Sequence, residues 1–187
     1  MAGSQATMAR GTTTTWKLDP AHTLVEFAAK HMMITTVKGR FSEVEGTIHD
    51  VDDDPTKSWV EATIKAASID TRTTDRDNHL RSADFLDVEH YPDITFESTR
   101  IEKTGNGAFR MHGDLTIRGQ TKPVALDVTR EGRGKDPWGG ERAGFSATGK
   151  IDRRDWGLTW NQALETGGIL VGNDIKVSIE VEAVKQG

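Results

Sequence analysis

Hydrophobic and polar residues alternate along most of the chain after Trp16. The segment 175–181 is the clearest case, because isoleucine or valine occupies every second position and lysine, serine or glutamate lies between them. The same alternation occurs in the segments 25–30, 60–65, 94–98, 109–117, 124–128 and 145–149. Successive side chains of a β-strand point to opposite faces, so this period of two predicts half-buried antiparallel strands.

Short glycine-containing segments separate several of these predicted strands. Residues 104–107 (Thr-Gly-Asn-Gly) and 118–121 (Arg-Gly-Gln-Thr) include residues that tolerate a positive φ, so each can close a hairpin between neighbouring strands. About eight strands joined in this way suit a barrel, because closure removes the exposed edges of an antiparallel sheet. We therefore predict a mainly β fold, a closed antiparallel β-barrel of about eight strands with one or two short helical segments.

Three segments interrupt the alternation, at residues 31–34, 77–88 and 162–170. The first contains consecutive apolar residues in a run too short for a core helix, and the other two are typical of short helical or irregular connections. We interpret all three as candidate caps over a mouth of the barrel. The acidic segment 50–55 and the glycine-rich segment 132–140 are interpreted as surface loops.

Composition is typical of one globular domain. The 187 residues are 35% hydrophobic and 28% charged, with a net charge of -5. Residues 1–15 are small and polar, and we expect them to be a disordered N-terminal lead to a domain formed by residues 16–187. They lack the apolar run of a secretory signal, and no stretch approaches the ~18 apolar residues of a membrane-spanning helix. These features predict a cytoplasmic protein without a transmembrane segment.

Several kinds of chemistry are disfavoured by the residues present. The chain has no cysteine, which excludes disulfides, thiolate metal sites and thiol nucleophiles. It has no cluster of lysine and arginine, which argues against nucleic acid as a partner. Neither His22 and His31 nor His79 and His90 have the spacing of a metal site. A Gly-x-Ser-x-Gly motif is absent and the segment 105–107 lies in a predicted hairpin turn, so we predict neither catalytic residues nor metal ligands.

The order of several motifs resembles that of a known family. They are Trp16-Lys17-Leu18-Asp19-Pro20-Ala21-His22-Thr23, Gly39-Arg40-Phe41, Ser68-Ile69-Asp70-Thr71, Arg76-Asp77-Asn78-His79-Leu80-Arg81-Ser82, Tyr91-Pro92-Asp93-Ile94-Thr95-Phe96, Gly113-Asp114-Leu115-Thr116-Ile117-Arg118-Gly119 and Arg154-Asp155-Trp156-Gly157-Leu158. From Trp16 to about Val184 the chain thereby resembles the YceI-like, polyisoprenoid-binding family. The resemblance implies an extended lipocalin-like barrel around an elongated apolar tunnel. It also implies binding of isoprenoids, isoprenoid quinones or fatty-acid-like lipids, without catalytic residues.

Inward-facing positions and the capping segments supply the candidate ligand-binding residues. They are Val25, Phe27, Ala29, Met32, Met33, Phe41, Ile64, Phe85, Leu86, Phe96, Leu115, Ile117, Phe145, Trp156 and Trp160. Small inward residues at 29, 62, 113 and 147 are expected to leave part of the interior free for a slender ligand. Six of the candidates, at 32, 33, 85, 86, 156 and 160, are expected to gate the mouth, although plain core packing stays an alternative for both tryptophans.

These observations predict a protein that binds a long-chain lipid for storage, transport or sequestration, with no cofactor besides that lipid and no enzymatic activity. Two alternatives stay open. An enzyme of isoprenoid or fatty-acyl metabolism would use Asp19, His22, His31, Arg76 and His79 around a barrel mouth. A stress-response interaction module would leave the tunnel incidental. Family relatives often pair through their barrels, so a homodimer also stays open, although no exposed apolar stripe demands one.

Overall fold

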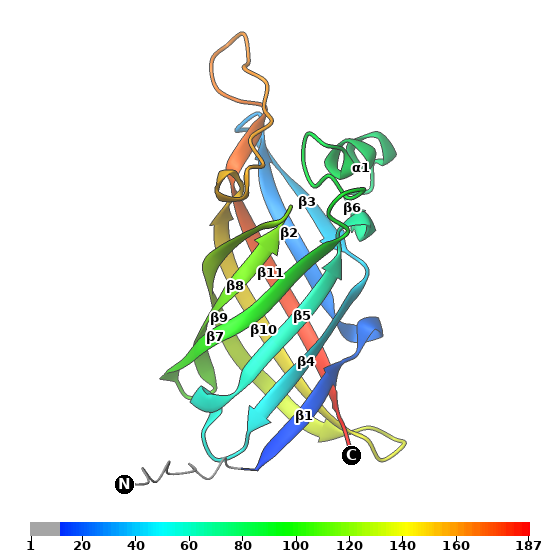
Figure 1. Cartoon of the computed structure of the whole chain (residues 1–187), viewed down its shortest axis with the longest axis vertical. Coiled ribbons are helices and arrows are strands. Elements are labelled where there is room, and N and C mark those ends of the chain that lie inside the picture. The colour runs from blue at the N-terminus through cyan, green and yellow to red at the C-terminus, as the bar shows by residue number, and fades with distance from the viewer. Residues whose placement is uncertain (1–11) are drawn as a thin grey trace, which may run out of the picture.

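Eleven strands form one continuous sheet in the computed structural model, which describes residues 12–187 (Figure 1). The strands are β1 (Thr13–Leu18), β2 (Leu24–His31), β3 (Thr35–Phe41), β4 (Val44–Val51), β5 (Trp59–Lys65), β6 (Ile69–Asp70), β7 (Asp93–Gly105), β8 (Ala108–Ile117), β9 (Gln120–Lys135), β10 (Glu141–Asp152) and β11 (Val171–Lys185). The helices of this part of the chain are α1 (Thr74–Arg81) and the short 3-10 helices η1 (Pro20–His22), η2 (Pro55–Lys57), η3 (Ala66–Ser68) and η4 (Arg153–Trp156).

The eleven strands make eight long strands, because three of the long strands are interrupted. The first long strand consists of β1 and β2, which both pair with β11. The second consists of β3, which pairs with β2, and β4, which pairs with β1. The third consists of β5, which pairs with β4, and β6, which pairs with β3, and β7 to β11 are the other five long strands. All neighbours are antiparallel, and the last strand pairs with the first. The prediction of a closed antiparallel barrel of eight strands with short helical segments is therefore confirmed.

Local chemistry places the interruptions. Pro20 fixes the start of η1, and the Asp19 carboxylate accepts a hydrogen bond from the Ala21 amide at 3.0 Å, which caps the turn that separates β1 from β2. The break between β3 and β4 lies beside the break between β5 and β6. There, the backbone amide of Glu43 donates to the Ser68 hydroxyl at 3.2 Å, and the Ser42 amide donates to the Ser68 carbonyl at 3.3 Å. Two breaks in neighbouring strands thus satisfy each other's backbone groups.

The predicted hairpin turns at 104–107 and 118–121 are confirmed. Gly107 has a φ of 67° in the turn between β7 and β8. Arg118 and Gly119 have φ values of 49° and 71° between the paired residues Ile117 and Gln120. Two consecutive residues with positive φ make the kind of two-residue turn whose twist matches that of the flanking strands.

Several predicted boundaries are corrected by strand pairing. Residues 13–15, expected in a disordered lead, belong to β1 and pair with residues 49–51 of β4, while residues 1–11 lie outside the described part of the chain. The segments 50–51 and 132–135, expected in surface loops, are the ends of β4 and β9. The sequence analysis did not include these extensions, because nearly all of their residues are threonine, aspartate, glycine, arginine or lysine rather than apolar.

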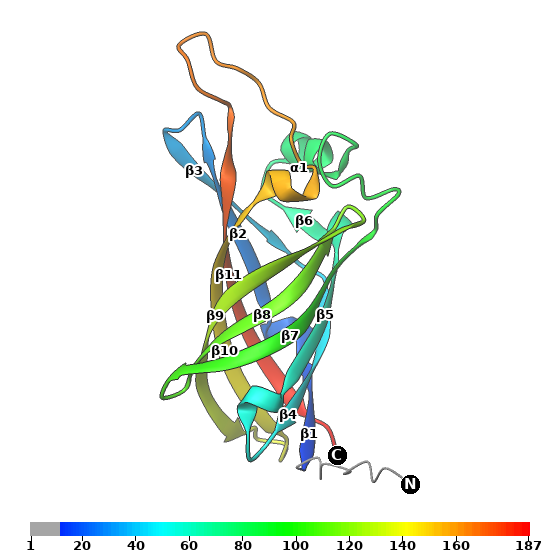
Figure 2. The same ribbon diagram turned by 60° about the vertical axis from the view of Figure 1, so that its left-hand side comes forward.

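Figures 1 and 2 show the two ends of the barrel, and an apolar cluster packs toward each of them. At the end drawn at the bottom, which we call the lower end, Trp16 of β1 packs with Ala143 and Ala183. At the opposite upper end, where α1 covers the strands, Trp156 of η4 packs with Ile69 of β6 and with residues on several other elements. The space between the clusters contains the candidate functional site.

Candidate ligand-binding cavity

A cavity of about 350 Å³ runs inside the barrel between the two clusters. Apolar side chains from the strands make up nearly all of its wall. Those of the middle section are Val25, Phe27, Ala29, Val60, Ala62, Ile64, Phe96, Met111, Leu126, Val128, Ala147, Ile175, Val177 and Ile179. Ligand cavities in proteins are commonly of about 300–1,000 Å³ with apolar walls and few polar groups, and this cavity falls within that range.

The exposure of the inward residues of β11 shows that the interior is hollow. Ile175, Val177 and Ile179 are half-buried, whereas the polar residues between them are exposed on the outer face. All three line the cavity, so the surface they leave uncovered faces its interior. In a close-packed interior, aliphatic side chains at such positions would be fully covered by their neighbours.

Eleven of the fifteen candidate ligand-binding residues lie in the cavity wall. They are Val25, Phe27, Ala29, Phe41, Ile64, Phe85, Leu86, Phe96, Leu115, Ile117 and Phe145. The structure brings them together from seven elements or connections, while their contact with a ligand stays a prediction. Met32, Met33, Trp156 and Trp160 are not part of the wall.

One of the four small inward residues does not free any space. Ala29, Ala62 and Ala147 are in the wall, as expected. At Gly113, however, the ring of Phe96 on the neighbouring strand occupies the place of a side chain, and a Cβ there would collide with it. The expectation that Gly113 leaves part of the interior unfilled is therefore wrong, because an aromatic ring on the adjacent strand covers it.

The six predicted gate residues occupy three different environments. Met32 and Met33 form the turn of the hairpin between β2 and β3, with φ values of 52° and 59°, and their side chains are exposed. Trp156 is 1% exposed and its Nε1 donates to the Leu115 carbonyl at 2.9 Å, so core packing holds for this ring. Phe85 and Leu86 are buried in the upper end of the wall, and the half-buried Trp160 ring lies 5.4 Å from that of Phe85.

Arg153 organises the upper end and was missed by the sequence analysis. This guanidinium is buried, and it donates to the carbonyls of Leu158, Trp160, Gly172 and Val171 at 2.7, 2.9, 3.0 and 3.3 Å. Burial lowers the pKa of Arg153, with no carboxylate bonded to it. Its hydrogen bonds tie the chain after η4 to the start of β11.

A second polar group was also missed, at the lower end of the cavity. Asp50, expected in a surface loop, is buried and faces inward at the end of β4. Its carboxylate accepts hydrogen bonds from Arg133 Nη2 at 2.6 Å and from the Ser58 hydroxyl at 3.1 Å. Arg130 also lines this end. The alternation could have predicted both positions. Residue 50 lies two positions after the inward Ile48, and residue 130 lies two positions after the inward Val128, so each side chain points to the same face as its predecessor.

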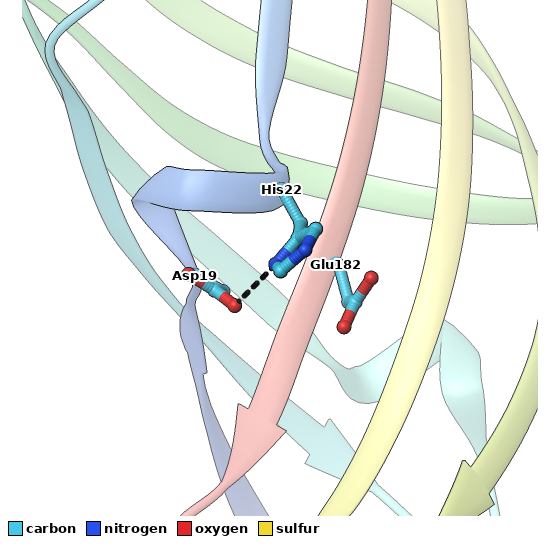
Figure 3. Close-up of side chains that lie close together, drawn as sticks. All are labelled: Asp19, His22 and Glu182. Carbon is cyan, nitrogen blue, oxygen red and sulfur yellow. Dashed lines mark hydrogen bonds and ion pairs between the residues drawn. The ribbon is translucent and has the colours of Figure 1, made fainter. Parts of the chain in front are cut away.

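Outside the barrel, Asp19, His22 and Glu182 lie close together beside β11 (Figure 3). His22 Nδ1 is 2.8 Å from Asp19 Oδ2, and Arg142 Nη1 donates at 2.8 Å to both carboxylates. The hydrogen bonds from His22 and then Arg142 lower the pKa of Asp19 to about 2, and the bond with Asp19 raises the pKa of His22. Arg142 is bonded to the carboxylates of Asp19, Glu182 and also Asp136, and these contacts hold η1 against the barrel.

The residues of the alternative enzyme hypothesis are not assembled into one site. His22 is bonded to Asp19 beside β11, whereas Arg76 and His79 belong to α1 at the upper end. Arg76 donates to Thr71, and His79 is bonded to the carboxylate of Asp84 at 2.8 Å.

Comparisons with known proteins agree on one family. The model of the YceI-like domain matches residues 16–183. The UPF0312 protein of Serratia proteamaculans is 42% identical over 164 residues, which cover 88% of this chain and 82% of that protein. Protein YceI of Escherichia coli is 40% identical over 165 residues, covering 88% and 83%.

Solved structures share the fold. A Campylobacter jejuni YCEI protein has a TM-score of 0.71 at 38% identity, covering 84% of this chain and 90% of that one. Burkholderia cenocepacia BcnA has a TM-score of 0.77 at 21% identity, covering 88% and 98%. A polyisoprenoid binding domain from Saccharophagus degradans, implicated in plant cell wall breakdown, has a TM-score of 0.64 at 13% identity, covering 91% and 98%.

Proposed function

This chain belongs to the YceI-like domain family, and from that premise we propose that its barrel binds a long-chain isoprenoid, isoprenoid quinone or fatty-acid-like lipid for storage, transport or sequestration. The single observation that carries the proposal is the apolar cavity between the two ends of the barrel. The Saccharophagus degradans domain that shares the fold is a polyisoprenoid binding domain, which supports the same class of ligand.

The energetics of an apolar wall favour a long chain over a short one. Each buried methylene contributes roughly 0.8 kcal/mol, so about ten of them contribute about 8 kcal/mol. Association costs about 4–15 kcal/mol in lost freedom. A short apolar molecule would therefore bind weakly in this cavity, and a long hydrocarbon chain is the ligand to which an almost wholly apolar wall is suited.

Extraction and rebinding test the proposal. An organic extract of the purified protein, examined by mass spectrometry, should contain a long-chain lipid in near-stoichiometric amount. Ala147→Phe, which places a ring in the cavity, should lower the amount of bound lipid, whereas Thr148→Phe on the outer face of the same strand should not. The proposal fails if the extract holds no lipid and the delipidated protein takes up none of the three lipid classes.

We infer that the protein is a binding protein rather than an enzyme. The charged residues that line the cavity are Glu26, Asp50, Arg130 and Arg153, and no histidine of residues 12–187 lies in its wall. Glu26 is exposed on β2, and the Asp50 carboxylate is already bonded to Arg133. General acid–base chemistry needs a titratable group within hydrogen-bond reach of the reacting atoms. Incubation with esters of long-chain alcohols should give no turnover above that of buffer, and sustained hydrolysis would contradict this inference.

Localisation in the cytoplasm and pairing into homodimers stay predictions. Cell fractionation tests the first, and light scattering on the purified protein tests the second. The described residues contain no helix that is both long and apolar enough to span a membrane.

A further inference from the structure

The lower end of the cavity contains an arginine, Arg130, that forms no ion pair within residues 12–187. Arg130 follows Leu126 and Val128 on the inward face of β9, and it lines the cavity. Its Nε is buried and has no hydrogen-bond partner, and within residues 12–187 its guanidinium forms no ion pair. Its one contact of note is with the Phe109 ring, whose centroid lies 5.8 Å from Cζ. Burying such a donor without an acceptor costs free energy, so a bound acceptor would stabilise this arrangement.

The carboxylate of Asp50, at the same end of the cavity, does not pair with Arg130. A bulge after Arg130 leaves Glu131 outside the register with β10, and the Glu131 carboxylate accepts a hydrogen bond from the Ser146 hydroxyl at 2.6 Å. The bulge also places Arg133 opposite Ala143, on the inward face. Arg133 Nη2 donates a hydrogen bond to Asp50 Oδ2 at 2.6 Å, and Arg133 Cζ lies 5.2 Å from the centroid of the Trp16 ring. The remaining Asp50 oxygen accepts from Ser58. Asp50 is therefore already paired with Arg133, and within residues 12–187 no carboxylate forms an ion pair with Arg130 at this end of the cavity.

Arg153, at the upper end of the same barrel, is an arginine whose hydrogen bonds serve the fold, and it can be compared with Arg130. Four backbone carbonyls accept its hydrogen bonds, so its charge is solvated by the protein. Within residues 12–187, by contrast, no atom accepts a hydrogen bond from the buried Nε of Arg130. The difference indicates that the guanidinium of Arg130 is available to a ligand, whereas that of Arg153 is used by the fold.

We propose that Arg130 binds an anionic oxygen headgroup of the lipid, a carboxylate or a phosphate monoester, with the hydrocarbon chain running toward the upper end. A guanidinium presents paired N–H donors that match two oxygens of one such group. Arg130 lines the cavity, so a ligand headgroup at the lower end can supply the acceptor that its buried Nε lacks within residues 12–187. The inference rests on the proposed lipid binding and specifies which lipids are preferred.

Matched pairs of ligands test the headgroup. The delipidated full chain is titrated calorimetrically at pH 8 with oleate and oleyl alcohol, which share one chain, and with farnesyl phosphate and farnesol. A hydrogen-bonded charge pair is expected to make the anion of at least one pair bind about tenfold to a hundredfold more tightly than its alcohol. The pair that shows this preference identifies carboxylate or phosphate as the source.

Three variants distinguish a direct contact between Arg130 and the headgroup from a general effect of positive charge on the protein. Arg130→Met should lower the affinity for the anion to that of the alcohol and leave alcohol binding unchanged, which also shows that the variant is folded. Arg130→Lys should keep part of the preference. Arg110→Met removes the same charge from the outer face of β8, where Arg110 lies 3.6 Å from Asp127, and should change neither affinity.

The outcomes distinguish the two proposals. Equal affinity for anion and alcohol in the wild type would overturn the headgroup proposal while leaving lipid binding intact. A preference that survives in Arg130→Met, or is lost equally in Arg110→Met, would also overturn it. Binding of none of the four ligands would count against the proposed function itself.

Discussion

Asp19 joins three elements through one carboxylate, and its ionisation therefore affects the stability of the barrel. Its oxygens accept hydrogen bonds from the Ala21 amide of η1 and from Arg142 of β10, and it is bonded to His22. Its folded pKa of about 2 is below the ordinary value of 3.8. The stabilisation from the ionised form is thus present above about pH 4 and is lost as the pH falls through 3.8 toward 2.

Asp19→Asn is expected to lower the free energy of unfolding at pH 7 by about 1 kcal/mol, a value reduced by solvent screening because the group lies at the surface. The difference from wild type should shrink as the pH falls from 4 to 2. Urea unfolding at a series of pH values measures it. A difference that stays constant down to pH 2 would mean that the ionised carboxylate is not the source of the stabilisation.

Gly113 tests how tightly the wall is packed. A methyl group there would collide with the Phe96 ring and approach the Glu97 carbonyl at 2.7 Å, so Gly113→Ala should destabilise the protein by about 1–3 kcal/mol and push the ring into the cavity. Gly132→Ala on β9 is the matched control, because no atom lies within 4 Å of its Cβ position. Denaturant unfolding and lipid titration measure both effects, and equal losses in the two variants would contradict this account.

At the scale of elements, the upper end is held by polar contacts from irregular segments to the barrel. Arg81 at the end of α1 donates to the carbonyls of Ala67 and Ile69, and Arg118 in the turn between β8 and β9 donates to the Phe85 carbonyl at 3.0 Å. Segments that join rigid strands are where a barrel can open without breaking its sheet. The upper end is therefore the part in which packing and opening must be separated experimentally.

Trp156 and Trp160 allow that separation. Trp156→Ala removes a ring that is 1% exposed and should cost about 3–5 kcal/mol of stability. Trp160→Ala removes a half-buried ring that contacts Phe85 and His79, and should cost no more than about 1–2 kcal/mol while lipid exchange becomes faster. Thermal unfolding and exchange of a fluorescent fatty acid measure the two effects. Unchanged exchange in Trp160→Ala would place the entrance elsewhere.

At the scale of the whole molecule, a hollow barrel gives up packing contacts that a ligand can restore. A ligand that binds only the folded state, at a free concentration 100 times its dissociation constant, raises the free energy of unfolding by about 2.7 kcal/mol. For a chain of this size that corresponds to roughly 5–10 °C in Tm. Scanning calorimetry of the delipidated protein with and without a long-chain lipid measures the shift, which should be smaller in Ala147→Phe. No shift at saturating lipid would argue against occupation of the cavity.

The alternation of hydrophobic and polar residues determined the class of fold, because a side-chain period of two that recurs in seven segments is typical of half-buried β-strands. The hairpin turns at 104–107 and 118–121 were equally readable, since positive φ values restrict the residues that can form them. Eleven of the fifteen candidate residues reached the cavity wall for the same reason, as the parity of a strand decides its inward face.

Tertiary structure alone decided how the inward polar residues are paired and which apolar residues lie outside the barrel. Asp50 and Arg133 are inward because β4, β9 and a bulge carry them there, where each neutralises the other. Met33 is outside because a hairpin turn places it at the tip. The place of Gly113 is filled by a ring from the adjacent strand. Strand parity indicates the inward position of residue 50, but these pairings and packings depend on contacts between segments far apart in the chain, which no local pattern contains.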